Sequence, residues 1–427
     1  MREPVVITGR SLATALGRGL DETWDSLLAG RSGIGDIEGF DASGFPCQSA
    51  ACVSGIDEQS LDLPRRESRI MDLHSFVLMK CATEAMAESG RPQHEDGGGD
   101  TGFFAAIGMV DYKQEDLIGA VSASRDAQGG IDYDRFYDQN FRDIFPLWPL
   151  SMLNNIALCQ VAVRLGLRGE NTVFSPHGDS ALQAVAEAVA TVVEGGNSAA
   201  LAGGVGEKVS ESSLARGLLH GMLNTRDRVD PCRPFSNDRA GGVLGEGGGA
   251  VLLESRARAE ERGASATAAV SGYGAAFGLA DPANATTGPS TDAIQRAMTL
   301  AIERAGRSPD EVDLVIAHGD GTREGDRQEW EAISGIFSRQ DSKTRLYSSK
   351  GALGNLLGGA PIVDLILAER MIQTGLIPPT YGIGDGETIA GSMLVRGQPL
   401  EARPRVVLIN GFSYEGQAGS LLTEALG

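Results

Sequence analysis

The segment 171–204, NTVFSPHGDSALQAVAEAVATVVEGGNSAALAGG, constrains the fold of this chain more than any other segment. Residues 172–174 are predicted to form a short buried strand. From Asp179 onward, apolar residues recur at helical spacing until the glycines at 195–196 end the helix. The join at 175–178 is therefore a sharp strand-to-helix elbow. Such an elbow presents free backbone N–H groups and the positive end of a helix to an adjacent pocket. It suits a nucleophile, yet the residues there offer no obvious one.

The rest of the chain alternates predicted strands with predicted helices, which is the pattern of an α/β fold with covered sheets. Strands are expected at 4–8, 102–109, 266–272, 314–317 and 406–409, and helices at 21–28, 71–88, 153–165, 290–305 and 361–374. Because the second set repeats the layout of the first, we predict an internal duplication with halves at 1–255 and 256–427. The segments 95–100 and 382–386 are expected to be surface turns.

Composition excludes several function classes. The net charge of −20 argues against a nucleic-acid partner, because phosphate binding needs a basic stripe and the sequence has none. No apolar run approaches the ~18 residues that cross a bilayer, and the first residues begin a strand rather than a signal sequence. We therefore expect a cytoplasmic protein with no membrane partner. The five cysteines are scattered without metal-ligand spacing, which is typical of buried thiols.

Two motifs in the second half of the sequence carry possible chemistry. The glycine cluster at 233–254 precedes its predicted strand, which is the wrong order for a dinucleotide loop, so it indicates close packing. His318 follows the predicted strand 314–317, at the end where open α/β sheets bind their ligands. By itself, His318 suits a packed turn at least as well as a ligand site.

Three acidic residues follow His318 in the sequence. Asp320, Asp326 and Glu329 lie in or just after a glycine-rich turn, where such residues are interpreted as turn and surface residues rather than a metal site. Lys350 begins a stretch of small residues and would need a carboxylate partner if it were buried. Glu329 is the candidate for that partner.

Four motifs together resemble a known family over nearly the whole chain. They are PCRPFSNDRAGGVLGEGGGAVLLE, AHGDGT followed by GDRQE, SSKGALGNLLGGAP, and the closing NGFSYEGQAGSL. In order and spacing they are similar to the β-ketoacyl-acyl carrier protein synthases of the thiolase superfamily. The resemblance implies a duplicated five-layer αβαβα fold that works as a dimer. It also implies condensation of an acyl thioester with malonyl on an acyl carrier protein, without a cofactor or a metal.

The reaction of that family needs a cysteine at the elbow, two histidines and a lysine. The resemblance places the first histidine on His318 and the lysine on Lys350, with Glu329 as its partner. The cysteine position falls on Gly178 and the second histidine position on Asn355. Glycine has no side chain and cannot form the acyl thioester, whereas an asparagine can still donate a hydrogen bond to a developing enolate.

A ketosynthase fold without its cysteine resembles the chain-length factors of type II polyketide synthases. These subunits pair with a cysteine-bearing ketosynthase as a heterodimer and shape the tunnel that holds the growing polyketide. Their usual replacement for the cysteine is glutamine, so Gly178 departs from that pattern as well. Because the chain and acyl carrier proteins are both acidic, we expect the carrier to dock on the partner.

The resemblance also implies a set of tunnel residues. In the family the strand end near 108–112 and a cross-dimer loop near 145–148 line the acyl pocket, and a glycine-rich gate, here 413–416, closes it. The substrate-binding residues expected on this basis are Met109, Asp111, Phe145, Leu147, Trp148, Phe412 and Tyr414. Core packing explains the apolar members equally well. Inside an apolar tunnel, Asp111 would need a partner or a raised pKa.

Two other hypotheses remain open at this point. One is an autonomous acyltransferase or decarboxylase of the same fold, in which Ser175, His177 or Ser180 acts as nucleophile or base near His318, with Asp179 orienting His177. The other is an acyl-binding or scaffold homodimer. Dependence on a cysteine-bearing partner distinguishes the chain-length factor from both.

Overall fold

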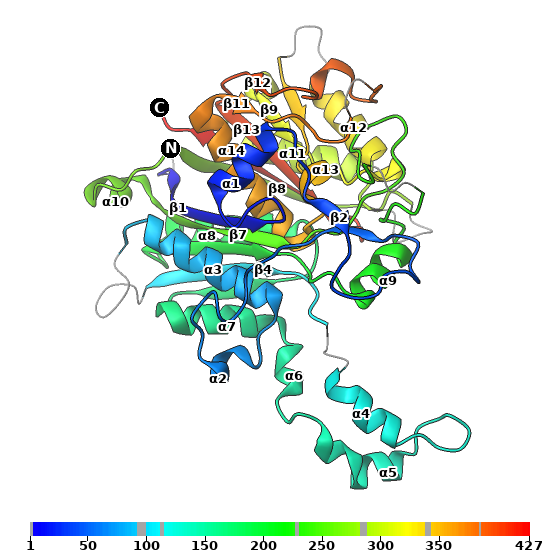
Figure 1. Cartoon of the computed structure of the whole chain (residues 1–427). Coiled ribbons are helices and arrows are strands. Elements are labelled where there is room, and N and C mark those ends of the chain that lie inside the picture. The colour runs from blue at the N-terminus through cyan, green and yellow to red at the C-terminus, as the bar shows by residue number, and fades with distance from the viewer. Residues whose placement is uncertain are drawn as a thin grey trace.

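A computed structural model describes residues 3–91, 100–111, 115–226, 230–281, 288–337, 343–383 and 386–427. In these ranges the large strands form one continuous sheet of two halves, covered by helices (Figure 1). The expected turns at 95–100 and 382–386 lie partly outside the described residues.

The two halves of the sheet have the same topology. The strands of the first half are β1 (Val5–Thr14), β4 (Thr101–Ile107), β5 (Asn171–Phe174), β6 (Ala199–Val205) and β7 (Gly247–Ser255). Those of the second are β8 (Ala268–Phe277), β9 (Leu314–Ile316), β10 (Arg345–Tyr347), β13 (Val406–Phe412) and β14 (Gln417–Ala425). The spatial orders are β1-β7-β6-β4-β5 and β8-β14-β13-β9-β10, with matching parallel and antiparallel pairings. This equivalence confirms the predicted duplication in topology.

The halves meet where the first strands of each lie side by side. β1 pairs with β8 over only two positions, Val5 with Val270 and Val6 with Ala269. The central strands β6 and β13 are buried along their whole length, as expected for strands with both faces covered. The prediction of a buried strand at 172–174 is wrong, because β5 is the last strand of the sheet and its first two residues are exposed.

Helices cover the sheet in three layers. α8 (Ser180–Glu194) and α14 (Ala360–Thr374) lie between the two halves and share one apolar core with both. α3 (Leu73–Glu88) and α7 (Asn154–Leu165) cover the outer face of the first half, and α11 (Thr291–Arg304) and α12 (Arg323–Phe337) that of the second. Because α14 is apolar on nearly all sides, only a fully buried position suits it. The result is the five-layer αβαβα architecture.

Several boundaries follow from local signals in the sequence. α8 begins directly after Asp179 and ends at Gly195, whose φ of 80° is in the left-handed region that favours glycine. The packing role predicted for the glycine cluster is also visible, because a Cβ on Gly248 would lie 2.2 Å from the carbonyl oxygen of Gly204. The strand predicted at 406–409 is part of β13. It forms a hairpin with β14, a strand that the sequence analysis did not predict.

A group of short helices extends away from the body of the protein (Figure 1). These are α4 (Glu115–Ala123), α5 (Tyr133–Asp138), the 3-10 turn Asn140–Asp143 and α6 (Trp148–Ser151), which we call the arm. The arm exposes the large side chains Ile118, Ile131, Tyr133, Tyr137, Phe141 and Leu147. Exposed apolar surface on a projecting segment is typical of a protein–protein contact.

The remaining helices and short strand pairs lie partly in the interior and partly at the surface. They are α1 (Leu20–Leu28), α2 (Arg65–Ser68), α9 (Glu211–Leu219), α10 (Arg256–Glu261), α13 (Lys350–Leu353), the pair β2 (Ile34–Asp36) and β3 (Ser49–Ala51), and the pair β11 (Leu376–Ile377) and β12 (Leu400–Glu401). None of the helices in the described ranges combines the length and the apolarity that a membrane-crossing helix requires.

Candidate functional site

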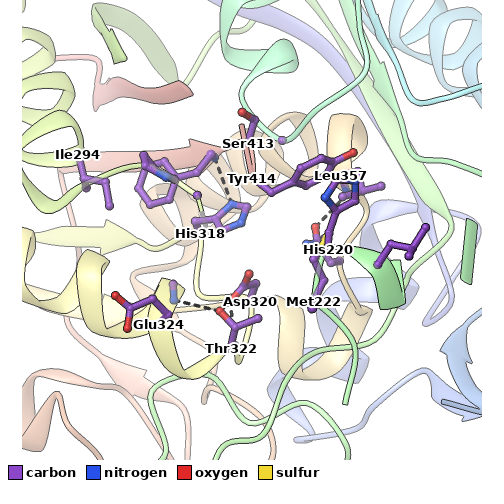
Figure 2. Close-up of a pocket in the computed structure, with 18 residues that line it drawn as sticks. His220, Met222, Ile294, His318, Asp320, Thr322, Glu324, Leu357, Ser413 and Tyr414 are labelled. Atoms are coloured by element: carbon purple, nitrogen blue, oxygen red, sulfur yellow. Dashed lines mark hydrogen bonds between the residues drawn. The ribbon is translucent and has the colours of Figure 1, made fainter. Parts of the chain in front are cut away.

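The elbow between β5 and α8 opens onto a cavity of about 320 Å³ (Figure 2). The cavity lies where the loops after β9, α9 and β13 converge on the elbow. The lining residues that matter below are Gly178, His220, His318, Asn355, Phe412 and Tyr414. The elbow of the first half and the loops of the second thus build one site.

Gly178 leaves no space for a side chain. A Cβ at this position would lie 2.5 Å from the carbonyl oxygen of Phe412 and 3.2 Å from Cε1 of His318. The first of these distances is far inside van der Waals contact, and the obstacle is backbone rather than a movable side-chain end. The closing loop therefore occupies the space that a nucleophile's Cβ would need.

His318 lies at the end of β9 and faces the centre of the cavity (Figure 2). Its Nδ1 accepts a hydrogen bond of 3.2 Å from the Phe412 N–H, so the neutral imidazole carries its proton on Nε2. Burial, together with the positive charge of Lys350, lowers the pKa of His318 well below its usual range. The site therefore contains a neutral imidazole that can donate a hydrogen bond from Nε2.

Lys350 and Glu329 act on the same peptide group. Lys350 is 1% exposed and donates from Nζ to the carbonyl oxygen of His318. The Glu329 carboxylate accepts from the N–H groups of His318 and Gly319, each at 2.8 Å, and from Nδ2 of Asn410 at 2.9 Å. Instead of the expected direct ion pair between them, the Lys350 ammonium and the Glu329 carboxylate each hydrogen-bond to the backbone of the turn at His318. Burial raises the pKa of Glu329.

Asn355 is 4% exposed and lines the cavity. Its Oδ1 accepts a 3.0 Å hydrogen bond from the Leu357 N–H, which fixes the orientation of the amide. Among the described residues, its Nδ2 has no hydrogen-bond partner. A buried donor without a partner is costly, and a ligand oxygen would satisfy it. Asn355 and His318 thus offer the cavity two donors suited to a carbonyl or enolate oxygen.

The three carboxylates after His318 organise the turn. Asp326 accepts from the N–H groups of Phe235 at 2.6 Å and Gly321 at 3.1 Å, and Asp320 accepts from the Thr322 N–H at 2.8 Å. Burial raises the pKa of Asp326 well above its usual range. Within the described ranges, no group of three or more histidine, cysteine or carboxylate side chains has a metal-binding arrangement.

The alternative nucleophiles are not presented to the cavity. The Ser175 hydroxyl accepts from Nδ2 of Asn154 at 2.6 Å, and the Ser180 hydroxyl donates to the carbonyl oxygen of His177. His177 pairs through Nε2 with Glu415 at 2.8 Å. None of Ser175, His177 and Ser180 lines the cavity. Asp179 bonds to Gln183 at 2.5 Å rather than orienting His177.

The proposed tunnel residues fall in two places. Of the seven, only Phe412 and Tyr414 line the cavity. Phe145, Leu147 and Trp148 belong to the arm or its approach, and Leu147 is 47% exposed. Their role in an acyl tunnel stays a prediction.

The strand end after β4 departs from an apolar tunnel wall. Asp111 pairs with Arg216 at 2.7 Å and accepts from the Ser210 hydroxyl at 2.9 Å. Arg216 also pairs with the buried Glu207 at 2.7 Å, and Glu207 accepts from the Met109 N–H at 3.3 Å. Asp111 therefore has its partner in a charged network, and Met109 is 40% exposed beside it. The partner that Asp111 was expected to need is Arg216, and the role of Asp111 in an acyl tunnel stays a prediction.

Several cavity residues were missed by the sequence analysis, and three of them are described here. His220, Met222 and Leu357 line the cavity beside Tyr414 or below it (Figure 2). His220 follows the end of α9, and no motif marks it. Only the fold brings the loop after α9 to the elbow, so no local pattern identifies His220 and Met222, whereas Leu357 lies within the motif SSKGALGNLLGGAP.

The low pKa of His318 predicts a pH dependence of stability. Its folded-state pKa lies below the unfolded value of about 6.5, so between the two values only the unfolded chain binds a proton. Stability from this group is therefore lost as the pH falls below about 6.5. In urea denaturation, lowering the pH from 7 to 5.5 should cost the native protein about 1 kcal/mol more than the His318→Gln variant. Equal losses would contradict this assignment.

Comparisons with known proteins agree with the fold and identify the family. A family model described as "Beta-ketoacyl synthase, N-terminal domain" matches residues 2–259, and one described as "Beta-ketoacyl synthase, C-terminal domain" matches residues 267–383. The chain is 29% identical to 3-oxoacyl-(acyl-carrier-protein) synthase 2 of Vibrio cholerae, with 98% of each chain covered. It is 30% identical to nodulation protein E of Rhizobium meliloti, with 97% of this chain and 98% of that protein covered.

A solved structure gives a similar result. The structure described as the ishigamide ketosynthase/chain length factor superposes with a TM-score of 0.83 at 26% identity, covering 100% of both chains. The similarity extends over both sheet halves.

Proposed function

This chain belongs to the β-ketoacyl synthase family, and within that family we propose that it acts as a chain-length factor. In this role it is a ketosynthase-fold subunit without a nucleophile. It forms a heterodimer with a cysteine-bearing ketosynthase and shapes the tunnel that receives the growing polyketide or acyl chain.

The observation that carries the proposal is the geometry at Gly178. A condensing enzyme must hold its acyl group covalently, and this elbow has neither a side chain nor the space for one. The remaining donors, His318 and Asn355, can bind a carbonyl oxygen but cannot form a thioester. A site with these two donors and no nucleophile suits a subunit whose partner carries out the condensation.

The arm and the edge strand supply surface for a partner. Among the described residues β5 is the last strand of the sheet, with its outer edge unpaired, and the arm exposes aromatic rings that cluster with each other. Within that cluster the rings of Phe136 and Tyr137 lie 5.2 Å apart, and those of Phe136 and Phe141 lie 6.1 Å apart. Unpaired strand edges and exposed aromatic residues are both typical of surfaces that become buried in a complex.

The proposal assigns the acyl carrier protein to the partner. The V. cholerae relative is named for an acyl carrier protein, and the ishigamide structure is described as a ketosynthase with a chain length factor. In a heterodimer the carrier needs to deliver its thioester only to the subunit with the cysteine. The net charge of −20 favours docking on the partner, because two acidic surfaces repel each other.

Co-expression with a cysteine-bearing ketosynthase from the same organism tests this function. We expect a one-to-one complex by size-exclusion chromatography with mass determination. Intact-mass measurement after incubation with acyl and malonyl carrier proteins should then show acylation of the partner only. Acylation of this chain, or turnover by this chain alone, would contradict the proposal.

Variants of the arm provide a matched control for the complex. Tyr137→Asp places a charge on the arm, and Phe277→Asp places one on an equally exposed ring at the end of β8. If the arm binds the partner, Tyr137→Asp should weaken the complex at least about tenfold. Phe277→Asp should leave it unchanged.

A further inference from the structure

Within the described residues, carboxylates line the cavity at the elbow and no positively charged side chain does. Asp320 and Glu324 belong to the lining, whereas no lysine or arginine belongs to it. The two lining imidazoles add no positive charge near pH 7, because burial lowers the pKa of both His220 and His318. A cleft whose charges have one sign attracts ligands of the opposite sign, so this cavity favours a cation.

Two cations lie behind this wall and are already engaged there. Lys350 donates to the carbonyl oxygen of His318. Arg239 donates to the carbonyl oxygen of Thr322 at 3.2 Å and pairs with the buried Asp326 at 3.4 Å. Neither cation lines the cavity. A carboxylate ligand would therefore find no positive side chain to pair with.

Asp320 offers the cavity one carboxylate oxygen. Its Oδ1 accepts two hydrogen bonds of 2.8 Å, from the N–H and from the hydroxyl of Thr322. Among the described residues, its Oδ2 has no hydrogen-bond partner, and Asp320 has no ion pair. Glu324, in contrast, pairs with Arg327 at 2.5 Å. Figure 2 shows Asp320 below His318 in the cavity wall, so Asp320 is the carboxylate that is left to bind a ligand.

A second, independent feature of the same cavity points to a ligand. Nδ2 of Asn355 is a donor without a partner among the described residues, on a side chain that is only 4% exposed. Together with Nε2 of His318 it suits a carbonyl oxygen. Apolar side chains, among them Met222 and Ile294, supply other parts of the wall. The cavity thus combines donors for an oxygen, apolar surface and an acceptor for a cation.

We propose that this cavity binds a small molecule that carries both a carbonyl oxygen and a protonated amine. The carbonyl oxygen accepts from Asn355 and His318, and the ammonium group donates to Asp320. An amino amide or an aminoacyl group has this chemistry. A ligand that carries a carboxylate in place of the amine is rejected, because its charge meets that of Asp320 with no cation to compensate. All of these residues belong to one chain, so the site does not depend on the proposed pairing with a ketosynthase.

Three matched probes test the charge preference on the full-length native chain. 6-Aminohexanamide, hexanamide and adipamic acid share an amide on a flexible chain, and at pH 7 they end in an ammonium, a methyl and a carboxylate group. In ligand-observed NMR titrations we expect 6-aminohexanamide to bind at least about fivefold more tightly than hexanamide, and adipamic acid to bind most weakly. For a ligand of this size the expected dissociation constant of the amine is on the order of 1 mM.

Substitutions at both ends of the site assign the preference to its residues. Asp320→Asn removes the charge and keeps an oxygen for the Thr322 N–H, so the preference for the amine should disappear. Asn355→Leu removes the free donor and should weaken the binding of all three probes. Asp25→Asn is the matched control, because Asp25 is exposed on α1 outside the cavity and its loss changes the net charge by the same amount. It should keep the preference of the native chain.

Several results would overturn the inference. They are equal affinities of the native chain for the three probes, tightest binding of adipamic acid, or no binding of 6-aminohexanamide at millimolar concentration. An Asp320→Asn variant that still prefers the amine would also overturn it. If that variant does not fold, the comparison on the native chain decides alone. No ketosynthase is present in these titrations, so their failure is distinct from a failure to form the heterodimer.

Discussion

Replacing Gly178 by alanine is expected to destabilise the folded chain by about 1–3 kcal/mol, although glycine-to-alanine changes in ordered backbone are often neutral or favourable. The reason is the carbonyl oxygen of Phe412, which lies 2.5 Å from the position of the new Cβ. Either the elbow or the loop after β13 must move to relieve the overlap. Urea denaturation of the two proteins measures the difference.

Gly44 provides the control for this substitution. It lies in an exposed turn, and a Cβ there would meet nothing within 4 Å. Gly44→Ala should therefore change the free energy of unfolding by less than about 0.5 kcal/mol. Equal stability of both variants would mean that the loop of Phe412 yields freely to a side chain at the elbow.

The same geometry predicts the outcome of restoring the cysteine. Gly178→Cys meets the overlap at Cβ before its sulfur is placed, so the thiol should not reach the position from which His318 assists catalysis. We expect no acylation of this variant by a small acyl thioester, which needs no docking of a carrier protein, in an intact-mass assay. Efficient acylation would show that the elbow differs from that of an active enzyme only by the missing side chain.

Lys350→Met is expected to have the largest effect on stability, a loss of about 3–5 kcal/mol. Lys350 is 1% exposed, and its positive charge favours the ionised forms of two buried carboxylates, Glu329 and Asp364. Methionine keeps most of the volume but leaves these charges uncompensated and the carbonyl oxygen of His318 without its donor. Denaturant unfolding at pH 7 measures the loss.

The pH dependence of this loss provides an internal check. Burial already raises the pKa values of Glu329 and Asp364, and without Lys350 they rise further. The folded variant therefore binds more protons than the unfolded chain, so acidification should reduce the deficit between pH 7 and pH 5. Lys343→Met, at an exposed position, is the control and should cost less than about 0.5 kcal/mol. A loss below about 1 kcal/mol for Lys350→Met would contradict the role assigned to its charge.

Much of the architecture could be predicted from local patterns. Apolar residues at helical spacing and the glycines at 195–196 located α8, and the repeated strand-and-helix layout predicted a duplication that the equal strand orders confirm. The boundary between halves at residue 255 stays a prediction. The edge position of β5 could not be predicted, because burial of a strand depends on which strands pair with it and not on its own composition.

The candidate site could likewise be predicted only in part from the sequence. Local patterns marked His318, after a predicted strand, and Lys350, in a small-residue stretch, whereas the family resemblance alone indicated Asn355. They did not show that Asp111 pairs with Arg216, which is 105 residues away along the chain. Nor did they indicate His220, because its place in the cavity depends on a loop contact between distant segments.

The sequence by itself determined that the position of the family's cysteine carries no side chain, since the identity of Gly178 is independent of conformation. Only the tertiary structure decided that a nucleophile would not fit there, because the obstacle is a carbonyl oxygen from the other half of the fold. The same holds for Lys350 and Glu329, whose charges meet at the peptide of His318 rather than at each other. Composition and spacing define which groups a chain can offer, whereas distances of 2–4 Å between segments far apart in sequence arise from packing alone.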